Sequence, residues 1–81
     1  MRLDKYLKVT RLIKRRTIAN EACDADKVLV NDKPARASYN VKTGDVITIC
    51  MGQKPLKVKV TAITEHVTKE NAADNYTVIS E

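Results

Sequence analysis

Apolar residues recur at helical spacing in the first part of the chain. One stripe marks a first helix, and its members are Leu3, Tyr6, Leu7 and Ile13. The basic residues fall largely off this stripe, and residues 11–16 form a basic turn beyond the expected end of the helix. A second, shorter helix is expected next, with an apolar stripe of Ile18, Ala19, Ala22 and Cys23.

After residue 26 the pattern changes to short, mostly β-branched segments separated by turn residues. We expect strands at 27–30, 46–50, 56–62 and 76–79, and a short helix at 68–74. Residues 31–34 have the composition of a turn, and Gly44 gives the turn at 41–45 access to positive φ. Segment 46–50 is apolar on both faces, which predicts a central strand, whereas 56–62 alternates and is expected to be half exposed.

This order of elements predicts the α+β fold class. Two N-terminal helices would pack on a small, mainly antiparallel sheet, followed by a short C-terminal helix and a final strand. The 81 residues contain no repeat and no linker, so we expect a single domain over residues 1–81 with a small core.

The net charge is concentrated in residues 1–16, which we call the N-terminal basic segment. It contains seven Lys or Arg residues and one acidic residue, whereas residues 17–36 carry a net charge of −1 and residues 37–81 are neutral. A charge run is ordinarily a solvated helix face, but an ordinary surface mixes both signs. We therefore interpret this segment as a binding surface for a polyanion, and nucleic acid is the expected one.

Side chains that carry enzyme or metal chemistry are scattered along the chain. Cys23 and Cys50 lack metal-ligand spacing and His66 stands alone, so we expect no metal, no cofactor and no catalytic residue. Cys23 lies on the apolar stripe of the second helix, which favours a core position over a redox role. No apolar run is long enough for a signal peptide or a membrane span, and we expect a cytoplasmic protein with reduced thiols.

The three tyrosines have two expected roles. Tyr6 and Tyr76 lie in apolar patterns and are expected in the core. Tyr39 lies in the weakly patterned segment 35–41, between Arg36 and Lys42, where its ring could instead stack on an RNA base.

Four short motifs follow one another in the first 50 residues. They are Arg2-Leu3-Asp4-Lys5-x-Leu7, Arg15-Arg16-Thr17-x-Ala19, Val28-x-Val30-Asn31 and Val41-Lys42-x-Gly44-Asp45. Each motif is weak alone, but the four together, in this order and spacing, resemble the ribosomal protein S4-type RNA-binding domain. The resemblance implies that two helices and the following hairpin form an L-shaped RNA-binding surface.

Within that family, the chain resembles the bacterial heat-shock S4-domain proteins and, more closely, the P-site tRNA stabilising factors of ribosome-associated quality control. We expect a non-enzymatic, monomeric factor, and the resemblance implies that it binds the large ribosomal subunit carrying peptidyl-tRNA. It also implies contacts to ribosomal RNA and to tRNA, and support for a tailing factor that extends the stalled chain at its C-terminus. The alternative is a ribosome-assembly factor or a general RNA-binding chaperone, for which the same basic segment would suffice. A fragment of an S4-linked RNA-modifying enzyme is disfavoured, because no second domain is present.

Matching the motifs position by position implies RNA contacts on a set of basic residues. These are Arg2, Lys5, Arg11, Lys14, Arg15 and Arg16, together with Lys33 in the hairpin. Asp4 is expected to orient neighbouring basic side chains rather than to touch phosphate. Arg16 opens the second helix, where its charge opposes the helix dipole, so we expect it to face an anion and to serve binding more than stability.

Two positions depart from the family pattern in a way that affects backbone conformation. Asp26 and Asp32 stand where the family prefers glycine, and both are expected to tolerate a left-handed conformation. Arg15 also replaces the usual small hydroxyl residue before the second helix.

Overall fold

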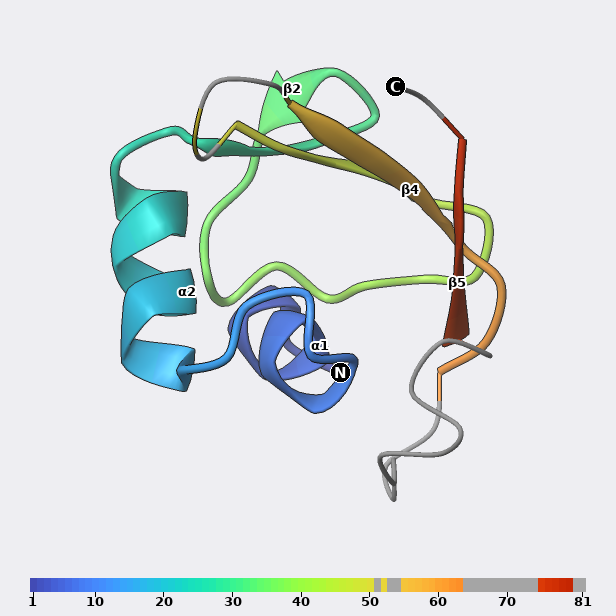
Figure 1. Ribbon diagram of the computed structural model, residues 1–81, viewed down its shortest axis with the longest axis horizontal. Coiled ribbons are helices and arrows are strands. Elements are labelled where there is room, and N and C mark those ends of the chain that lie inside the picture. Colours follow the sequence, from blue (N-terminus) through green and yellow to red (C-terminus); the bar gives the residue numbers. More distant parts are fainter. Residues whose placement is uncertain (51, 53–54, 64–74, 80–81) are drawn as a thin grey trace.

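The computed structural model describes residues 1–50, 52, 55–63 and 75–79. In this part of the chain, two helices cover one face of a five-stranded sheet with strand order β2-β1-β3-β4-β5 (Figure 1). The elements are α1 (Leu3–Val9), α2 (Arg16–Asp24), β1 (Val28–Val30), β2 (Lys33–Pro34), β3 (Val46–Ile49), β4 (Leu56–Val60) and β5 (Tyr76–Val78). All the pairings are antiparallel, which confirms the α+β fold class. The helix expected at 68–74 and His66 lie outside the described residues.

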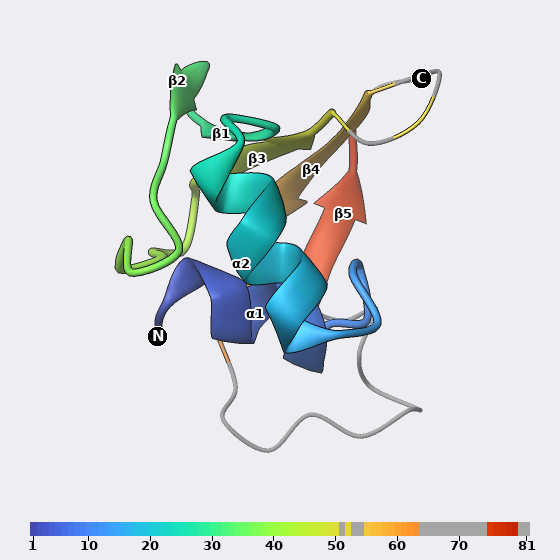
Figure 2. The same cartoon turned by 90° about the vertical axis from the view of Figure 1, so that its left-hand side faces the viewer.

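The first turn of α1 is capped by a distant loop instead of a side chain. Arg2 occupies the N-cap position without a side-chain cap. The backbone N–H groups of Leu3 and Asp4 donate to the carbonyl oxygens of Tyr39 (2.8 Å) and Ala37 (3.2 Å), which satisfies two donors that a helix start leaves open. Figure 2 shows the segment after β2 running down to the start of α1. The weakly patterned segment 35–41 is therefore held by backbone hydrogen bonds, which no side-chain pattern reveals.

Two residues of the expected helical stripes differ from the prediction, one in its element and one in its burial. α1 ends at Val9, so Ile13 is not part of it, contrary to the prediction. Ile13 is nevertheless buried, because its N–H donates to the Leu7 carbonyl (3.1 Å) and the turn folds back on α1. Ile18 was expected in the core but is 37% exposed, because α2 packs through the narrower stripe of Ala19, Ala22 and Cys23.

Left-handed residues end α2 and form the following hairpin. The N–H groups of Asp26 and Lys27 donate to the carbonyls of Cys23 (3.1 Å) and Ala22 (2.9 Å), the bonding pattern of a Schellman motif. Asp26 has φ of 58°, and Asn31 and Asp32 have φ of 53° and 68° in the turn between β1 and β2. The left-handed conformations expected of Asp26 and Asp32 are confirmed.

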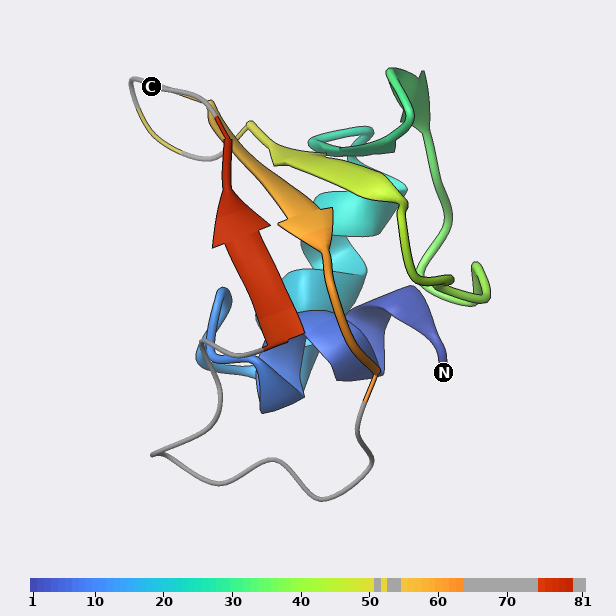
Figure 3. The same ribbon diagram turned by 90° about the vertical axis from the view of Figure 1, so that its right-hand side faces the viewer.

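β2 was not predicted, because residues 33–34 were assigned to the turn. Lys33 pairs with Val30 and Pro34 with Leu29, so the two residues form a short edge strand. Proline lacks a backbone N–H and is tolerated at a sheet edge. The predicted central position of segment 46–50 is confirmed, because β3 pairs with both β1 and β4. The face of the sheet opposite the helices is seen in Figure 3.

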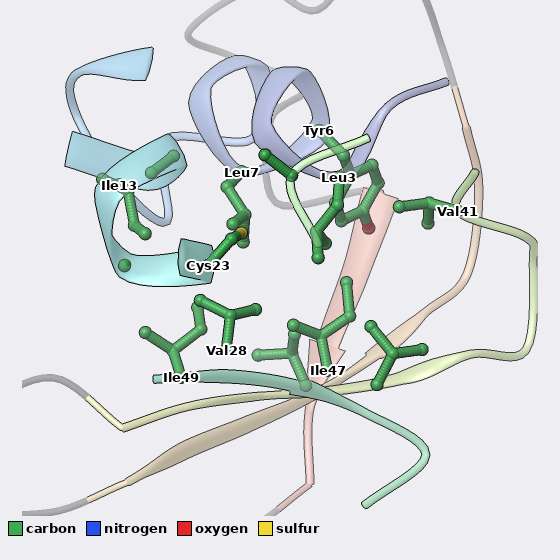
Figure 4. Packing of buried hydrophobic residues seen from close by; sticks show 14 of the residues in the cluster. Leu3, Tyr6, Leu7, Ile13, Cys23, Val28, Val41, Ile47 and Ile49 are labelled. Atoms are coloured by element: carbon green, nitrogen blue, oxygen red, sulfur yellow. The ribbon is translucent and has the colours of Figure 1, made fainter. Parts of the chain in front are cut away.

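The core lies between the helices and the sheet. Figure 4 shows Leu3 and Leu7 of α1 directed toward Val28 and Ile47 of the sheet. Tyr6 is buried as predicted, and its hydroxyl donates to the Asn75 carbonyl (2.6 Å), which ties the start of β5 to α1. Tyr76 packs against the core but is only half-buried.

Cys23 is part of the same core, as predicted. Burial, together with the nearby carboxylates of Asp4 and Asp24, raises the pKa of the Cys23 thiol to about 11. The thiol is therefore protonated at neutral pH, which removes the thiolate that redox chemistry requires.

Candidate nucleic-acid interface

A buried carboxylate organises two arginines from different elements. The Asp4 side chain is 3% exposed, and its Oδ1 and Oδ2 atoms lie 3.2 Å from Nε of Arg2 and Nε of Arg16, respectively. Arg2 also donates from Nη2 to Oδ2 (3.4 Å), and the Lys5 N–H donates to Oδ1 (2.8 Å). The expectation that Asp4 orients basic side chains agrees with this geometry. We call Arg2, Asp4 and Arg16 the Asp4 clamp.

The electrostatics of the Asp4 clamp favour the ionised carboxylate. Burial alone would raise the pKa of Asp4, but hydrogen bonds from Arg2, Arg16 and the Lys5 N–H outweigh it, so the pKa is lowered. Both arginine side chains are about half exposed, at 52% for Arg2 and 50% for Arg16. Arg16 contacts Asp4 through Nε, so within the described residues its Nη donors are left for an external anion.

The Asp4 clamp changes the expected role of Arg16. The first turn of α2 contains no acidic residue and its N-cap, Arg15, provides no side-chain cap. Asp4 of α1 supplies the missing negative charge beside Arg16, so the anion expected there is partly internal. Removing Arg16 would leave the buried Asp4 with one arginine instead of two. We therefore expect Arg16 to contribute to the stability of the fold as well as to binding.

The turn between the helices presents a second group of basic residues. Lys8, Arg11 and Lys14, with Val9, line a hollow of about 380 Å³. Arg11 has φ of 63°, and its N–H donates to the Lys8 carbonyl (3.0 Å), so it takes the left-handed position after α1 that glycine usually occupies. A bulky side chain in this conformation costs free energy.

The structure groups the seven predicted contact residues unequally. Arg2 and Arg16 meet at Asp4, and Arg11 and Lys14 share the hollow of the turn. Arg15 is the exposed residue that connects these two groups along the chain, and Lys5 is half-buried on α1. Lys33 lies on edge strand β2 and lines a different hollow.

One basic residue of this surface was missing from the predicted set. Lys8 is exposed in the last turn of α1 and lines the same hollow as Arg11 and Lys14. Its membership of the N-terminal basic segment was visible in the sequence, but no motif position selected it.

Neither helix in the described part of the chain is long and apolar enough to cross a membrane.

The fold and the clustered cations define a class of protein, the small S4-domain proteins. The S4 domain family model matches residues 1–47, which contain both helices, the hairpin and the Asp4 clamp. The chain is 48% identical over 81 residues to the "RQC P-site tRNA stabilizing factor" of Bacillus subtilis, covering all of this chain and 94% of that protein. It is 47% identical to the protein of the same name from Listeria monocytogenes, covering all of this chain and 88% of that protein.

A solved structure has the same fold. The 2.3 Å structure of heat shock protein 15 from Vibrio cholerae superposes with a TM-score of 0.91 at 27% identity, covering 99% of this chain and 82% of that one. The chain belongs to the S4-domain family and, within it, to the family of RQC P-site tRNA stabilizing factors.

Proposed function

We propose that this chain is a non-enzymatic RNA-binding factor of ribosome-associated quality control. It would bind the large ribosomal subunit carrying peptidyl-tRNA in the P site, with contacts to both ribosomal RNA and tRNA. The name of its relatives from Bacillus subtilis and Listeria monocytogenes, RQC P-site tRNA stabilizing factor, supports this role. The observation that carries the proposal is the concentration of exposed cations on the two helices and the turn between them.

The geometry suggests how one small domain would stabilise a bound tRNA. The Asp4 clamp and the hollow of the turn are two separate clusters of cations, joined by Arg15. Arginine forms bidentate contacts to phosphate and lysine acts as a point charge. If the clusters bind different RNAs, each contact raises the effective concentration of the other, so the tRNA dissociates more slowly. Retained peptidyl-tRNA would then remain available to a tailing factor.

The test compares two lysines by co-sedimentation with purified large subunits at fixed salt. Lys14→Ala removes an exposed cation of the turn, and Lys59→Ala removes an exposed lysine of β4 as a charge-matched control. Lys57 is less suitable, because its Nζ lies 3.8 Å from Asp32. We expect Lys14→Ala to weaken binding roughly tenfold, the effect of one charged hydrogen bond, and Lys59→Ala to bind like the parent.

The same assay separates the proposal from its main alternative. A quality-control factor should bind subunits carrying P-site peptidyl-tRNA more tightly than vacant subunits, because only the former offer both RNAs. Equal affinity for the two kinds of subunit would favour a ribosome-assembly factor or a general RNA-binding chaperone. Equal losses for both lysine variants would show that only net charge matters.

A further inference from the structure

A hollow beside the β1–β2 hairpin is separate from the basic residues of the helices. It has a volume of about 680 Å³, within the range of small-molecule sites, and we call it the hairpin pocket. Its lining includes Val30, Lys33, Pro34, Arg36 and Tyr39. The lining therefore combines apolar surface, one aromatic ring and two cations.

The aromatic ring is held in place before any ligand binds. Tyr39 packs against the core on one side and lines the hairpin pocket on the other. Its hydroxyl donates to Oδ2 of Asp45 (2.9 Å), and Asp45 is itself buried. A ring with a fixed orientation loses little conformational entropy on stacking, so it suits a flat ligand.

The charge around the hairpin pocket favours an anionic ligand. Lys33 and Arg36 are exposed, and within the described part of the chain neither forms an ion pair. Two carboxylates of the described residues are close to this lining in the chain or by contact. Asp45 is already engaged, because it accepts from Tyr39, from Nδ2 of Asn31 (3.2 Å) and from the Lys42 N–H (2.9 Å), and Asp32, which precedes Lys33, lies 3.8 Å from Nζ of Lys57. A flat group attached to phosphates matches these features, and a nucleotide of a single-stranded RNA has that chemistry.

The hairpin pocket adjoins one end of the N-terminal basic segment. The Tyr39 carbonyl accepts from the Leu3 N–H (2.8 Å), and Arg2 forms an isolated β-bridge with Asn40. Figure 2 shows the loop that follows β2 reaching the N-terminal end of α1. An RNA strand that contacts the Asp4 clamp can therefore continue toward Tyr39.

We propose that the hairpin pocket binds one unpaired RNA base, stacked on Tyr39, while Lys33 and Arg36 hold the adjacent phosphates. This inference rests on the RNA-binding function proposed above and adds a site that reads the base as well as the backbone. The contribution of Tyr39 should therefore depend on the presence of a base, whereas that of the helical cations should not.

The first experiment uses calorimetry with two probes, a twelve-nucleotide oligoadenylate and a base-free polyphosphate of similar charge. Tyr39→Leu keeps an apolar side chain but cannot stack, and Tyr39→Phe keeps the ring and loses only the hydroxyl. We expect Tyr39→Leu to weaken oligoadenylate binding roughly five- to hundredfold, the range for one base stacked on an aromatic ring, without changing polyphosphate binding. Tyr39→Phe should stay within about twofold of the parent, and Lys14→Ala should weaken binding of both probes.

A second experiment needs no variant and covers the case in which Tyr39→Leu fails to fold. An oligonucleotide with a single 4-thiouridine is irradiated with the parent protein, and the crosslinked peptide is identified by mass spectrometry. We expect a crosslink within residues 33–39. Crosslinks confined to residues 2–16, unchanged oligoadenylate binding by folded Tyr39→Leu, or equal losses for the two probes would each overturn the proposal.

These results are independent of the test of the proposed function. If the parent prefers subunits carrying tRNA but the pocket experiments fail, the quality-control role stands without the base site. If the base-dependent effect of Tyr39 is present but subunits with and without tRNA bind equally, the base site stands and the quality-control role falls.

Discussion

At the scale of the residue, Arg11 shows a conflict between stability and binding. Its φ of 63° places it where glycine normally follows a helix, and its side chain lines the hollow between the helices. Such a residue lowers the stability of the fold and is expected to contribute to function.

Replacing Arg11 with glycine should separate these two effects. Arg11→Gly relieves the left-handed strain, and we expect stability to rise by about 0.5–1 kcal/mol after the greater entropy of glycine in the unfolded chain is included. Affinity for large subunits carrying tRNA should fall, because a phosphate donor is lost. A thermal melt and co-sedimentation measure the two outcomes. A variant that melts lower than the parent would show that the Arg11 side chain has a structural role.

Asp4 gives the protein a specific sensitivity to acid. Because its pKa is lowered in the fold, the ionised carboxylate stabilises the protein fully above the ordinary Asp pKa of about 4. This contribution is lost as the pH falls through the lower pKa of the folded state. Asp45 acts in the same direction, because the Lys42 N–H, Tyr39 and Asn31 together outweigh its burial and lower its pKa.

The variant Asp4→Asn should therefore be destabilised at pH 7 and less sensitive to acid below pH 4. We expect a loss of about 1–3 kcal/mol at pH 7, because the two arginines are half exposed and recover part of their solvation. Denaturant melts of the parent and the variant between pH 7 and pH 2 measure the difference. If the two stability curves stay parallel over this range, the Asp4 clamp does not stabilise the fold.

At the scale of the element, α1 both contributes to the core and positions cations at its two ends. Its apolar face packs on the sheet, whereas its ends carry Arg2 and the turn that contains Arg11. The position of the cations therefore depends on the packing of a helix of only seven residues. A helix this short is not stable alone in water, so tertiary packing must hold it.

Leu7→Ala should reveal this dependence. Leu7 has no exposed surface, so we expect a loss of about 2–5 kcal/mol from reduced burial and a cavity. Ile18→Ala on α2 is the control, because Ile18 is 37% exposed and its loss should cost much less. Thermal melts of the two variants and the parent measure these losses of stability. A Leu7→Ala variant as stable as Ile18→Ala would contradict the packing of α1 seen in Figure 4.

At the scale of the whole molecule, the asymmetry of charge is the dominant feature. The net charge of +5 arises from the N-terminal basic segment, so one face should direct the approach of RNA. Binding that neutralises phosphates releases counterions and weakens as the salt concentration rises.

The salt dependence of binding follows from the number of phosphates contacted. If about five phosphates are neutralised, the slope of log K against log salt should be roughly −3.5 to −4.5, with the coefficients for single strands and for a DNA duplex as the two limits. Binding titrations of the protein with large subunits, at salt concentrations from about 50 to 200 mM, measure this slope. A flat dependence would rule out a surface dominated by phosphate contacts.

The sequence by itself determined the features that depend on neighbouring residues. The stripe of Leu3 and Leu7, the left-handed positions of Asp26 and Asp32, and the N-terminal charge are local properties of the chain. Periodicity, conformational preference and net charge can all be derived without knowledge of the fold.

Only the tertiary structure decided which distant groups meet. Asp4 joins Arg16 across the turn between the helices, the loop around Tyr39 caps α1, and Lys33 lies in the hairpin pocket, separate from the helical cations. The loop around Tyr39 contacts α1 through backbone carbonyls, which carry no sequence signature. Packing brings these groups together, and packing depends on the whole chain, so no local pattern could reveal them.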